Sequence, residues 1–452
     1  MSKSRLIFVS VAAVLIIVLI GGFLYWFKGV PHKPKEVTLT FWGVFDDSDN
    51  YSGLIAAFKN DQLMQERSPK DVAIEYRKFE YEDYEKSLRD AWSRGQGPDI
   101  FLIHNTWLPN YQEYITPYPQ ADKDDMNFDL YKQSFMSVAT YDFTRGGQIY
   151  AAPLSIDTLA LYYNKDILEE YYRENPSESN ILEPPTTWSD FIDRVGVVTK
   201  KDEWGNLQRA GAALGTANNI NRSTDILYLI MLQTGTQMVS DDFTKAEFAK
   251  TTTADGSVYN PGERSLEFYT DFANPKKKIF TWNRQKDYSI DEFAEGDVAM
   301  MLGYSHLIGS LEKKSPNLNY GIAPAPQLAQ AQKPLNYANY WGLSVPRFSK
   351  DTKTAWDFIK FASERENVAT YLSSTKRPTA RADLVTWQEQ EMPELATFIR
   401  QGLSAKSWYQ ANPDAIEKIF LEMIEKINYN SSTISRAIND AAKEVTNLMR
   451  GI

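Results

Sequence analysis

Residues 82–103 read EDYEKSLRDAWSRGQGPDIFLI and contain a helix, a turn and a strand in immediate succession. The apolar side chains that recur on one face of the helix are Leu88, Ala91 and Trp92. This spacing predicts a helix over Glu82 to Arg94, which Gly95 ends. After a turn at Gly97-Pro98, Asp99 to Ile103 forms a short apolar strand. A helix followed so closely by an apolar strand is typical of α/β folds.

The segment upstream shows the same alternation of strand and helix. Val37 to Val44 is a β-branched and aromatic run that predicts a strand. Residues 54–58 carry apolar side chains at helical spacing, and residues 72–76 alternate as in a strand. Together with residues 82–103, the order is β-α-β-α-β. It predicts a parallel, doubly wound sheet and places the protein in the α/β class.

A second series of elements begins near residue 158. Residues 158–163 form an apolar strand, and a helix follows Thr187, which we expect to form a capping pair with Asp190. Further along, Ser289 and Glu292 have the spacing of a capping box at the start of another helix. The remaining predicted elements are a strand over 298–302 and amphipathic helices over 416–427 and 434–448.

Composition sets the size of the protein and excludes several function classes. A chain of 452 residues exceeds one typical domain, so we expect two large domains or one two-lobed unit. The first 35 residues hold five Lys or Arg and no acidic residue, so 44 cations face 59 carboxylates in the remainder, a net charge of −15. So acidic a body repels phosphate backbones, and we expect no nucleic-acid partner. The absence of Cys excludes disulfides, thiol nucleophiles, Cys-ligated metals and a lipid-modified Cys.

The N-terminal segment predicts a membrane anchor. Leu6 to Phe27 is a run of 22 residues without a charge, which as a helix would span a hydrocarbon core of about 30 Å. The run is longer than the apolar part of a signal peptide, and residues 28–34 offer no small-residue cleavage site. A cleaved signal peptide is the alternative. We expect a single-pass cell-membrane protein whose main body lies outside the cytoplasm.

Short motifs in a fixed order extend over nearly all of residues 37–450. They are LTFWG at 39–43, GQGPDIF at 95–101, GQIYAAP at 147–153, LYYNKD at 161–166, PTTW at 185–188, FAEGDVAMM at 293–301 and YWG at 340–342. In this order the chain resembles the carbohydrate-type extracellular solute-binding proteins of ABC importers, of which maltose-binding protein is the familiar member. Many relatives carry a lipid on an N-terminal Cys, and this chain departs from them because it has none.

The resemblance implies a periplasmic-binding-protein-like fold of type II, with two α/β lobes and a sugar-sized cleft at the hinge between them. By analogy, lobe 1 takes residues 36–153 and 304–365, and lobe 2 takes residues 154–303 and 366–452. Residues 1–35 form a short stub, the transmembrane helix and a tether. The chain is expected to cross between the lobes near Pro153 to Asp157, near Leu302 to Tyr304, and within Ser374 to Arg381.

Candidate ligand contacts combine aromatic and polar side chains at strand ends. Pyranose rings present flat C–H faces and a rim of hydroxyls, so a sugar site needs apolar platforms surrounded by planar hydrogen-bonding groups. The carboxyl ends of strands are also where open α/β sheets bind ligands. The twelve candidates are Trp42, Phe45, Asp46, His104, Asn105, Trp107, Asp157, Asn221, Tyr304, His306, Trp341 and Trp408. Among them, Asp157 matches the position at which relatives hold a ligand carboxylate.

The motifs of common enzymes are absent from the sequence. There are three His and no G-x-S-x-G, H-E-x-x-H, P-loop or dinucleotide-binding motif, so we expect no catalytic residue, cofactor or metal. Two alternatives stay open. Paired carboxylates in an aromatic cleft also describe a glycoside hydrolase. A receptor for peptides or polyamines would share the same fold.

The sequence therefore predicts a membrane-anchored extracellular solute-binding protein. We expect its lobes to close on a mono- or oligosaccharide, because aromatic faces from one lobe and hydrogen bonds from the other are satisfied together only in the closed state. The permease subunits of an ABC transporter are the expected partner.

Overall fold

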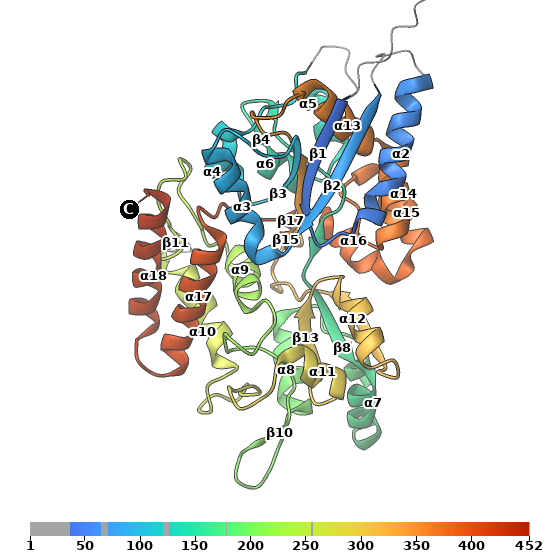
Figure 1. The fold of residues 1–452 in the computed structure, drawn as a ribbon. Coiled ribbons are helices and arrows are strands. Elements are labelled where there is room, and N and C mark those ends of the chain that lie inside the picture. The colour runs from blue at the N-terminus through green and yellow to red at the C-terminus, as the bar shows by residue number, and fades with distance from the viewer. Residues whose placement is uncertain (1–36, 65–70, 121–125, 178, 255, 452) are drawn as a thin grey trace, which may run out of the picture.

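The computed structural model describes residues 37–64, 71–120, 126–177, 179–254 and 256–451 (Figure 1). The predicted membrane helix over Leu6 to Phe27 and the tether after it lie outside these ranges. Within the described ranges, no helix is long and apolar enough to cross a membrane. The described chain folds around two hydrophobic cores, each built on its own sheet, and Figure 1 shows one sheet above the other.

The first core surrounds a five-stranded sheet with the order β2-β1-β3-β16-β6. Its strands are β1 (Val37–Val44), β2 (Val72–Phe79), β3 (Ile100–His104), β16 (Trp341–Ser344) and β6 (Ala152–Pro153). The first three confirm the predicted strands, and β1 is parallel to both of its neighbours. The sheet as a whole is mixed, because β16 runs antiparallel between β3 and β6. The prediction of a purely parallel sheet is wrong at this edge, where β16 continues directly from a strand of the hinge.

Helices and the sheet together bury the first core. The helices of this region are α2 (Ser48–Met64), α3 (Tyr81–Ser93), α4 (Leu108–Tyr111), α5 (Phe128–Ser134), α6 (Ser137–Phe143), α13 (Thr352–Ala362) and α14 (Arg365–Thr375). Strand β3 is buried from Ile100 to Ile103, as expected for an apolar run in the middle of a sheet covered on both faces. The hydroxyl of Tyr84 on α3 donates to the Leu102 carbonyl oxygen at 2.8 Å and so ties this helix to β3.

The second core surrounds an antiparallel sheet with the order β13-β8-β14. Its strands are β8 (Ala160–Asn164), β13 (Met300–Gly303) and β14 (Tyr320–Pro324). The surrounding helices are α7 (Lys165–Glu174), α8 (Trp188–Val198), α9 (Ser223–Gln233), α10 (Pro261–Asp271), α11 (Ser289–Glu295), α12 (Leu307–Lys314), α15 (Val385–Glu391), α16 (Ala396–Gly402), α17 (Pro413–Asn428) and α18 (Ile434–Met449). The two predicted C-terminal helices are confirmed as α17 and α18, which pack against each other.

Three short hairpins and four 3-10 turns complete the described elements. The hairpins are β4 (Thr144–Arg145) with β5 (Gln148–Ile149), β9 (Lys200–Lys201) with β10 (Leu207–Arg209), and β11 (Thr252–Ala254) with β12 (Ser257–Tyr259). The 3-10 turns are η1 (Gln112–Tyr114), η2 (Ser179–Leu182), η3 (Ala382–Leu384) and η4 (Pro393–Leu395).

One of the two predicted helix caps is present. The Thr187 hydroxyl accepts from the Asp190 backbone N–H at 3.1 Å and caps α8, as expected. Ser289 does not cap α11, because it is the first helical residue and its hydroxyl accepts from the Asn221 backbone N–H at 2.8 Å. Glu292 accepts from the Asp287 backbone N–H at 2.9 Å, just before the helix, and forms an ion pair with Lys286 at 2.9 Å. The Glu half of the predicted box thus reaches back to a residue before the helix, whereas Ser289 has a distant partner instead of a capping role.

The chain crosses between the cores at places that differ in part from those expected. The first change of core falls between Ile156, which belongs to the first core, and Leu159, which belongs to the second. The second does not occur at Leu302 to Tyr304, because the segment 304–325 stays in the second core and the chain returns between Tyr337 and Tyr340. Residues 368–384 pack in the first core, so the Ser374 to Arg381 stretch is not a crossing either. The expected lobe boundaries at 304 and 365 are therefore displaced.

A small sheet with the order β17-β15-β7 forms the hinge. Its strands are β7 (Asp157–Thr158), β15 (Asn336–Asn339) and β17 (Ala405–Lys406), and β15 continues through Tyr340 into β16. The Asp142 carboxylate of α6 accepts hydrogen bonds from Asn105 at 3.2 Å, from the Tyr340 hydroxyl at 2.7 Å and from the Ser407 hydroxyl at 2.5 Å. Burial raises the pKa of Asp142 to about 6, although the three donors oppose that shift. One buried carboxylate thus joins the segments that connect the two cores.

Candidate functional site

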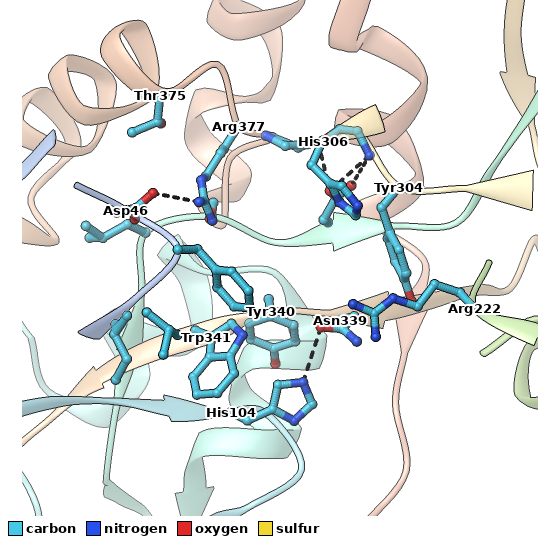
Figure 2. A pocket seen from close by; sticks show the side chains of 18 of the residues that line it. Asp46, His104, Arg222, Tyr304, His306, Asn339, Tyr340, Trp341, Thr375 and Arg377 are labelled. Carbon is cyan, nitrogen blue, oxygen red and sulfur yellow. Dashed lines mark hydrogen bonds and ion pairs between the residues drawn. The ribbon is translucent and has the colours of Figure 1, made fainter. Parts of the chain in front are cut away.

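A cavity of about 690 Å³ lies beside the hinge and is lined by residues of both cores (Figure 2). The first core supplies the segment after β1 and the ends of β3 and β16. The second core supplies the start of α9, the segment after β13, and α17. This volume is within the range of small-molecule sites.

An aromatic group forms one wall of the cavity. Phe45 stacks on Tyr81 with ring centroids 5.7 Å apart, and Trp341 meets Phe45 edge-on at 6.0 Å. Phe45 is 48% exposed and has a φ of 64°, in a tight turn closed by a 2.7 Å hydrogen bond from the Asp46 N–H to the Val44 carbonyl oxygen. A left-handed conformation is costly for a Phe, and such strain concentrates at functional sites. The turn holds an apolar ring at the open cavity.

Asp46 anchors one polar end of the cavity. Its buried carboxylate accepts from the Arg377 guanidinium at 2.6 Å, from the Tyr51 hydroxyl at 2.9 Å and from the Tyr371 hydroxyl at 2.8 Å. Figure 2 shows the Asp46–Arg377 pair on the opposite side of the cavity from Arg222. Asp46 and Arg377 therefore each have a partner of opposite sign within the protein.

Asp157 lies next to this pair, and the protein satisfies its oxygens. They accept from the Ser305 N–H at 3.0 and 3.1 Å, from the Ser305 hydroxyl at 2.7 Å and from the Thr158 N–H at 2.9 Å. Burial raises the pKa of Asp157 to about 6, and these hydrogen bonds limit the rise. Asp157 thereby fixes the segment that carries His306 into the cavity.

The two histidines of the cavity are neutral at pH 7. Burial lowers the pKa of His104 to about 4, and its ring contacts Asn339 Oδ1 at 3.2 Å and Thr106 Oγ1 at 2.8 Å. The pKa of His306 is also lowered to about 4, by burial and by the charges of Arg222 and Arg377. Neutral imidazoles can both donate and accept hydrogen bonds.

The opposite polar end of the cavity centres on Arg222. This residue precedes α9 in a left-handed conformation, with φ 56° and ψ 36°. The Tyr304 hydroxyl donates to Asp225 at 2.9 Å beside it, and Glu417 of α17 completes this end. In the described part of the chain, the Arg222 guanidinium has no hydrogen bond and no ion pair within 4.0 Å.

Seven of the twelve candidate contacts line the cavity. They are Phe45, Asp46, His104, Asp157, Tyr304, His306 and Trp341. Six of them, all except Trp341, end or follow a strand or lie at or just after a predicted crossing. The structure also places Tyr304 and Asp157 at the hinge side of the cavity, although the crossing expected at Tyr304 lies elsewhere.

The other five candidates do not line the cavity. Trp42 points to the opposite face of β1 from Phe41 and packs on Phe79 at 4.7 Å. Trp107 is 4% exposed and lies behind Trp341 at 5.1 Å. Trp408 is buried in the second core against Tyr228.

Two of those five are polar residues engaged elsewhere. Asn105 donates to Asp142, and its carbonyl oxygen accepts from the Tyr340 N–H at 3.3 Å, so it belongs to the hinge network. Asn221 accepts from the Tyr288 hydroxyl at 3.1 Å. Both were expected to contact a ligand because of their residue type, and both have partners within the protein.

Several lining residues were missed by sequence reasoning. They are Tyr81, Arg222, Asp225, Asn339, Arg377 and Glu417. Arg222 follows an Asn-rich loop at a helix start, and Tyr81 comes directly after the end of β2, so strand-end and loop patterns could have found these two. Arg377 and Glu417 lie in helical surroundings far along the chain, and no local pattern marks them.

A model of the family described as bacterial extracellular solute-binding protein matches residues 54–397 of the chain. The chain belongs to this family. The resemblance drawn from the ordered motifs is thereby confirmed, and so is the prediction of a binding protein in place of a glycoside hydrolase.

Several relatives of this solute-binding protein are named for the sugars that they bind. A maltotriose-binding protein of Pyrococcus abyssi is 24% identical over 296 residues, which cover 64% of this chain and 56% of that protein. The match therefore spans little more than half of that relative. The melibiose/raffinose/stachyose-binding protein MelE of Bacillus subtilis is 23% identical over 354 residues, covering 76% of this chain and 74% of that protein.

A solved structure agrees with the two-lobed fold of this solute-binding protein. The cyclic alpha-maltosyl-1,6-maltose binding protein of Arthrobacter globiformis superposes with a TM-score of 0.72 at 18% identity, covering 92% of this chain and 100% of that one. The expected two-lobed α/β architecture is therefore confirmed.

Proposed function

We propose that this solute-binding protein captures a mono- or oligosaccharide between its two lobes and delivers it to the permease of an ABC importer. The observation that carries the proposal is the cavity beside the hinge, with an exposed aromatic wall between two polar ends. Relatives named for maltotriose and for melibiose, raffinose and stachyose support a sugar as the ligand class.

The lining supplies both kinds of contact that a pyranose needs. Phe45, Tyr81 and Trp341 offer apolar faces for the C–H surface of a sugar ring. His104 and His306 lie around them with neutral rings that suit hydroxyl groups. Because these groups come from both cores, a ligand that contacts all of them favours the closed arrangement of the lobes.

We further propose that Leu6 to Phe27 anchors the protein in the cell membrane and that the described body lies outside the cytoplasm. The uncharged run and the missing cleavage site support this arrangement. Fractionation of cells, with protease added to intact cells, tests it. Full-length protein in the membrane and digestion of the body from outside are expected. A soluble chain that begins after Phe27 contradicts the anchor, and protection of the body contradicts the orientation.

A ligand screen tests the sugar-binding function. Residues 36–452 are melted with a panel of mono- and oligosaccharides, and hits are confirmed by calorimetry. A ligand at 100 times its Kd stabilises the folded state by about 2.7 kcal/mol, which gives a clear rise in Tm. Maltotriose, melibiose and raffinose belong in the panel, and a peptide and a polyamine mixture test the alternative receptor classes. Stabilisation by peptides or polyamines with no response to any sugar would overturn the proposal.

A further inference from the structure

The Arg222 end of the cavity carries more negative than positive charge. Three charged side chains line it, the Arg222 guanidinium and the carboxylates of Asp225 and Glu417. Asp225 is 7% exposed, accepts a hydrogen bond from Tyr304 at 2.9 Å and interacts with the side chains of Asn339 and Arg222. Among the described residues, Glu417 has no hydrogen bond and no ion pair within 4.0 Å, as is the case for Arg222. Exposed Asp414, one turn from Glu417 on α17, adds a further negative charge nearby.

A buried hydroxyl at the same end also lacks a partner. Tyr228 is 2% exposed, lines the cavity and lies one turn along α9 from Asp225. Its hydroxyl has no hydrogen bond within 3.5 Å in the described part of the chain, and Thr224, one turn earlier on α9, acts on it only as a weak hydrogen-bond partner. Buried hydroxyls are rarely left without a partner, so this atom points to a polar group that the protein itself does not supply.

The opposite end of the cavity is different because its two carboxylates have hydrogen-bond partners within the protein. Asp46 pairs with Arg377, and Asp157 is held by Ser305 and Thr158. The histidines between the two ends are neutral at pH 7. The burial that raises the pKa of Glu417 and the pKa of Asp225 is consistent with carboxylates that lack full compensation.

We propose that the Arg222 end selects the ligand by charge and binds a sugar that carries an amino group there, while it rejects sugars that carry a carboxylate or phosphate. A cation placed among these side chains meets two opposite charges and one like charge, and an anion meets the reverse. The inference rests on the proposed function and specifies its ligand class. Glu417 is then the specificity-determining residue, which binds the amino group, and Tyr228 binds an adjacent hydroxyl of any of these sugars.

Three trisaccharide probes that differ only in the charge of one substituent test the proposed selection by charge. We compare maltotriose with two derivatives in which one terminal 6-hydroxyl is replaced by an amino group or oxidised to a carboxylate, both changes being made at the same end of the trisaccharide. Calorimetry at pH 7 and low salt gives the three Kd values. We expect the amino derivative to bind at least about tenfold more tightly than maltotriose and the carboxylate derivative at least about tenfold more weakly.

Glu417→Gln removes one negative charge at nearly constant shape and brings the Arg222 end to neutrality. The amino derivative should then lose its advantage. Glu312→Gln is the matched control, because Glu312 is an exposed carboxylate at the rim of the same cavity, and the charge order should persist in that variant. Tyr228→Phe should weaken all three probes by a similar factor. Ligand-free melting confirms that each variant folds.

Each outcome separates this inference from the proposed function. Equal affinities for the three probes, or tightest binding of the carboxylate, overturn the charge selection and leave sugar binding intact. The same response of Glu417→Gln and Glu312→Gln also overturns it. If folded protein binds none of the three probes, the inference fails, and the response to the wider sugar panel decides separately whether the proposed function stands.

Discussion

Trp341 and Trp107 form a natural pair for testing which aromatic residues belong to the binding site. Their rings are 5.1 Å apart, yet Trp341 lines the cavity, whereas Trp107 lies behind it with 4% exposure. Trp341 also contacts Tyr84 at 5.9 Å and His104 at 5.0 Å. One part of its indole is therefore packed in the protein, and another part faces the space that a ligand would fill.

These positions set different magnitudes for the two truncations. Trp107→Ala empties a buried volume and should cost about 3 to 5 kcal/mol of unfolding free energy. Trp341→Ala should cost less stability, roughly 2 kcal/mol, because the indole is only half-buried. The same change removes a stacking surface and should reduce sugar affinity by about 1 to 3 kcal/mol. Trp107→Ala should change affinity by less than about tenfold, since it acts only through the support of Trp341.

Two measurements on each variant test whether Trp341, and not Trp107, contacts the ligand. Denaturant unfolding of the ligand-free protein gives the stability change, and calorimetry with the best sugar from the screen gives the affinity change per folded molecule. The expected result is a crossed pattern, with the larger stability loss in Trp107→Ala and the larger affinity loss in Trp341→Ala. An unchanged affinity in Trp341→Ala would remove that residue from the site and refute the idea of an aromatic platform.

Three further predictions concern charge and motion. Because burial raises the pKa of Asp142 from 3.8 to about 6, its contribution to stability is fully present below pH 4 and is lost as pH rises through 6, by roughly 3 kcal/mol. Asp142→Asn should flatten that part of the pH–stability curve, and an unchanged slope would contradict the assignment. Arg377→Ala leaves the buried Asp46 carboxylate without its cation and should cost about 1 to 3 kcal/mol of stability by denaturant unfolding, whereas Arg377→Lys should recover part of it. Small-angle scattering should show a smaller radius of gyration with a bound sugar than without it, and tight binding at constant radius would exclude closure.

The first half of the fold was predictable because local patterns determine it. Each element from β1 to β3 has its own apolar period and its own stop residue, so even the bounds of β1 follow from the sequence. The path of the chain after β13, where it stays in the second core, was not predictable in the same way. Tyr304 continues into the second core because its hydroxyl donates to Asp225 and its carbonyl oxygen accepts from Tyr162, and neither partner is close in sequence.

The site was predictable to the extent that it follows from strand ends. Phe45, Asp46 and His104 follow β1 or end β3, and all three line the cavity. The direction of a side chain was not predictable from its place near a strand end. Trp42, for example, lies on the face of β1 opposite Phe41 and packs on Phe79 outside the cavity. Arg377 was unpredictable for a different reason, because its partner Asp46 is 331 residues away in the sequence.

Residue type alone does not distinguish a sugar contact from a hinge contact, since Asn, Asp and Tyr suit both. Asn105 and Asp142 have the composition of a binding site, but each finds its hydrogen-bond partners in the protein and so joins the hinge segments together. Arg222, Glu417 and Tyr228 line the cavity with donors and acceptors that no described residue satisfies. Polar groups in contact with a cavity lose water when a ligand closes it, so those without protein partners gain most from ligand contact. The Arg222 end holds such groups and has more carboxylates than cations. We therefore expect this part of the cavity to discriminate among sugars by their charge.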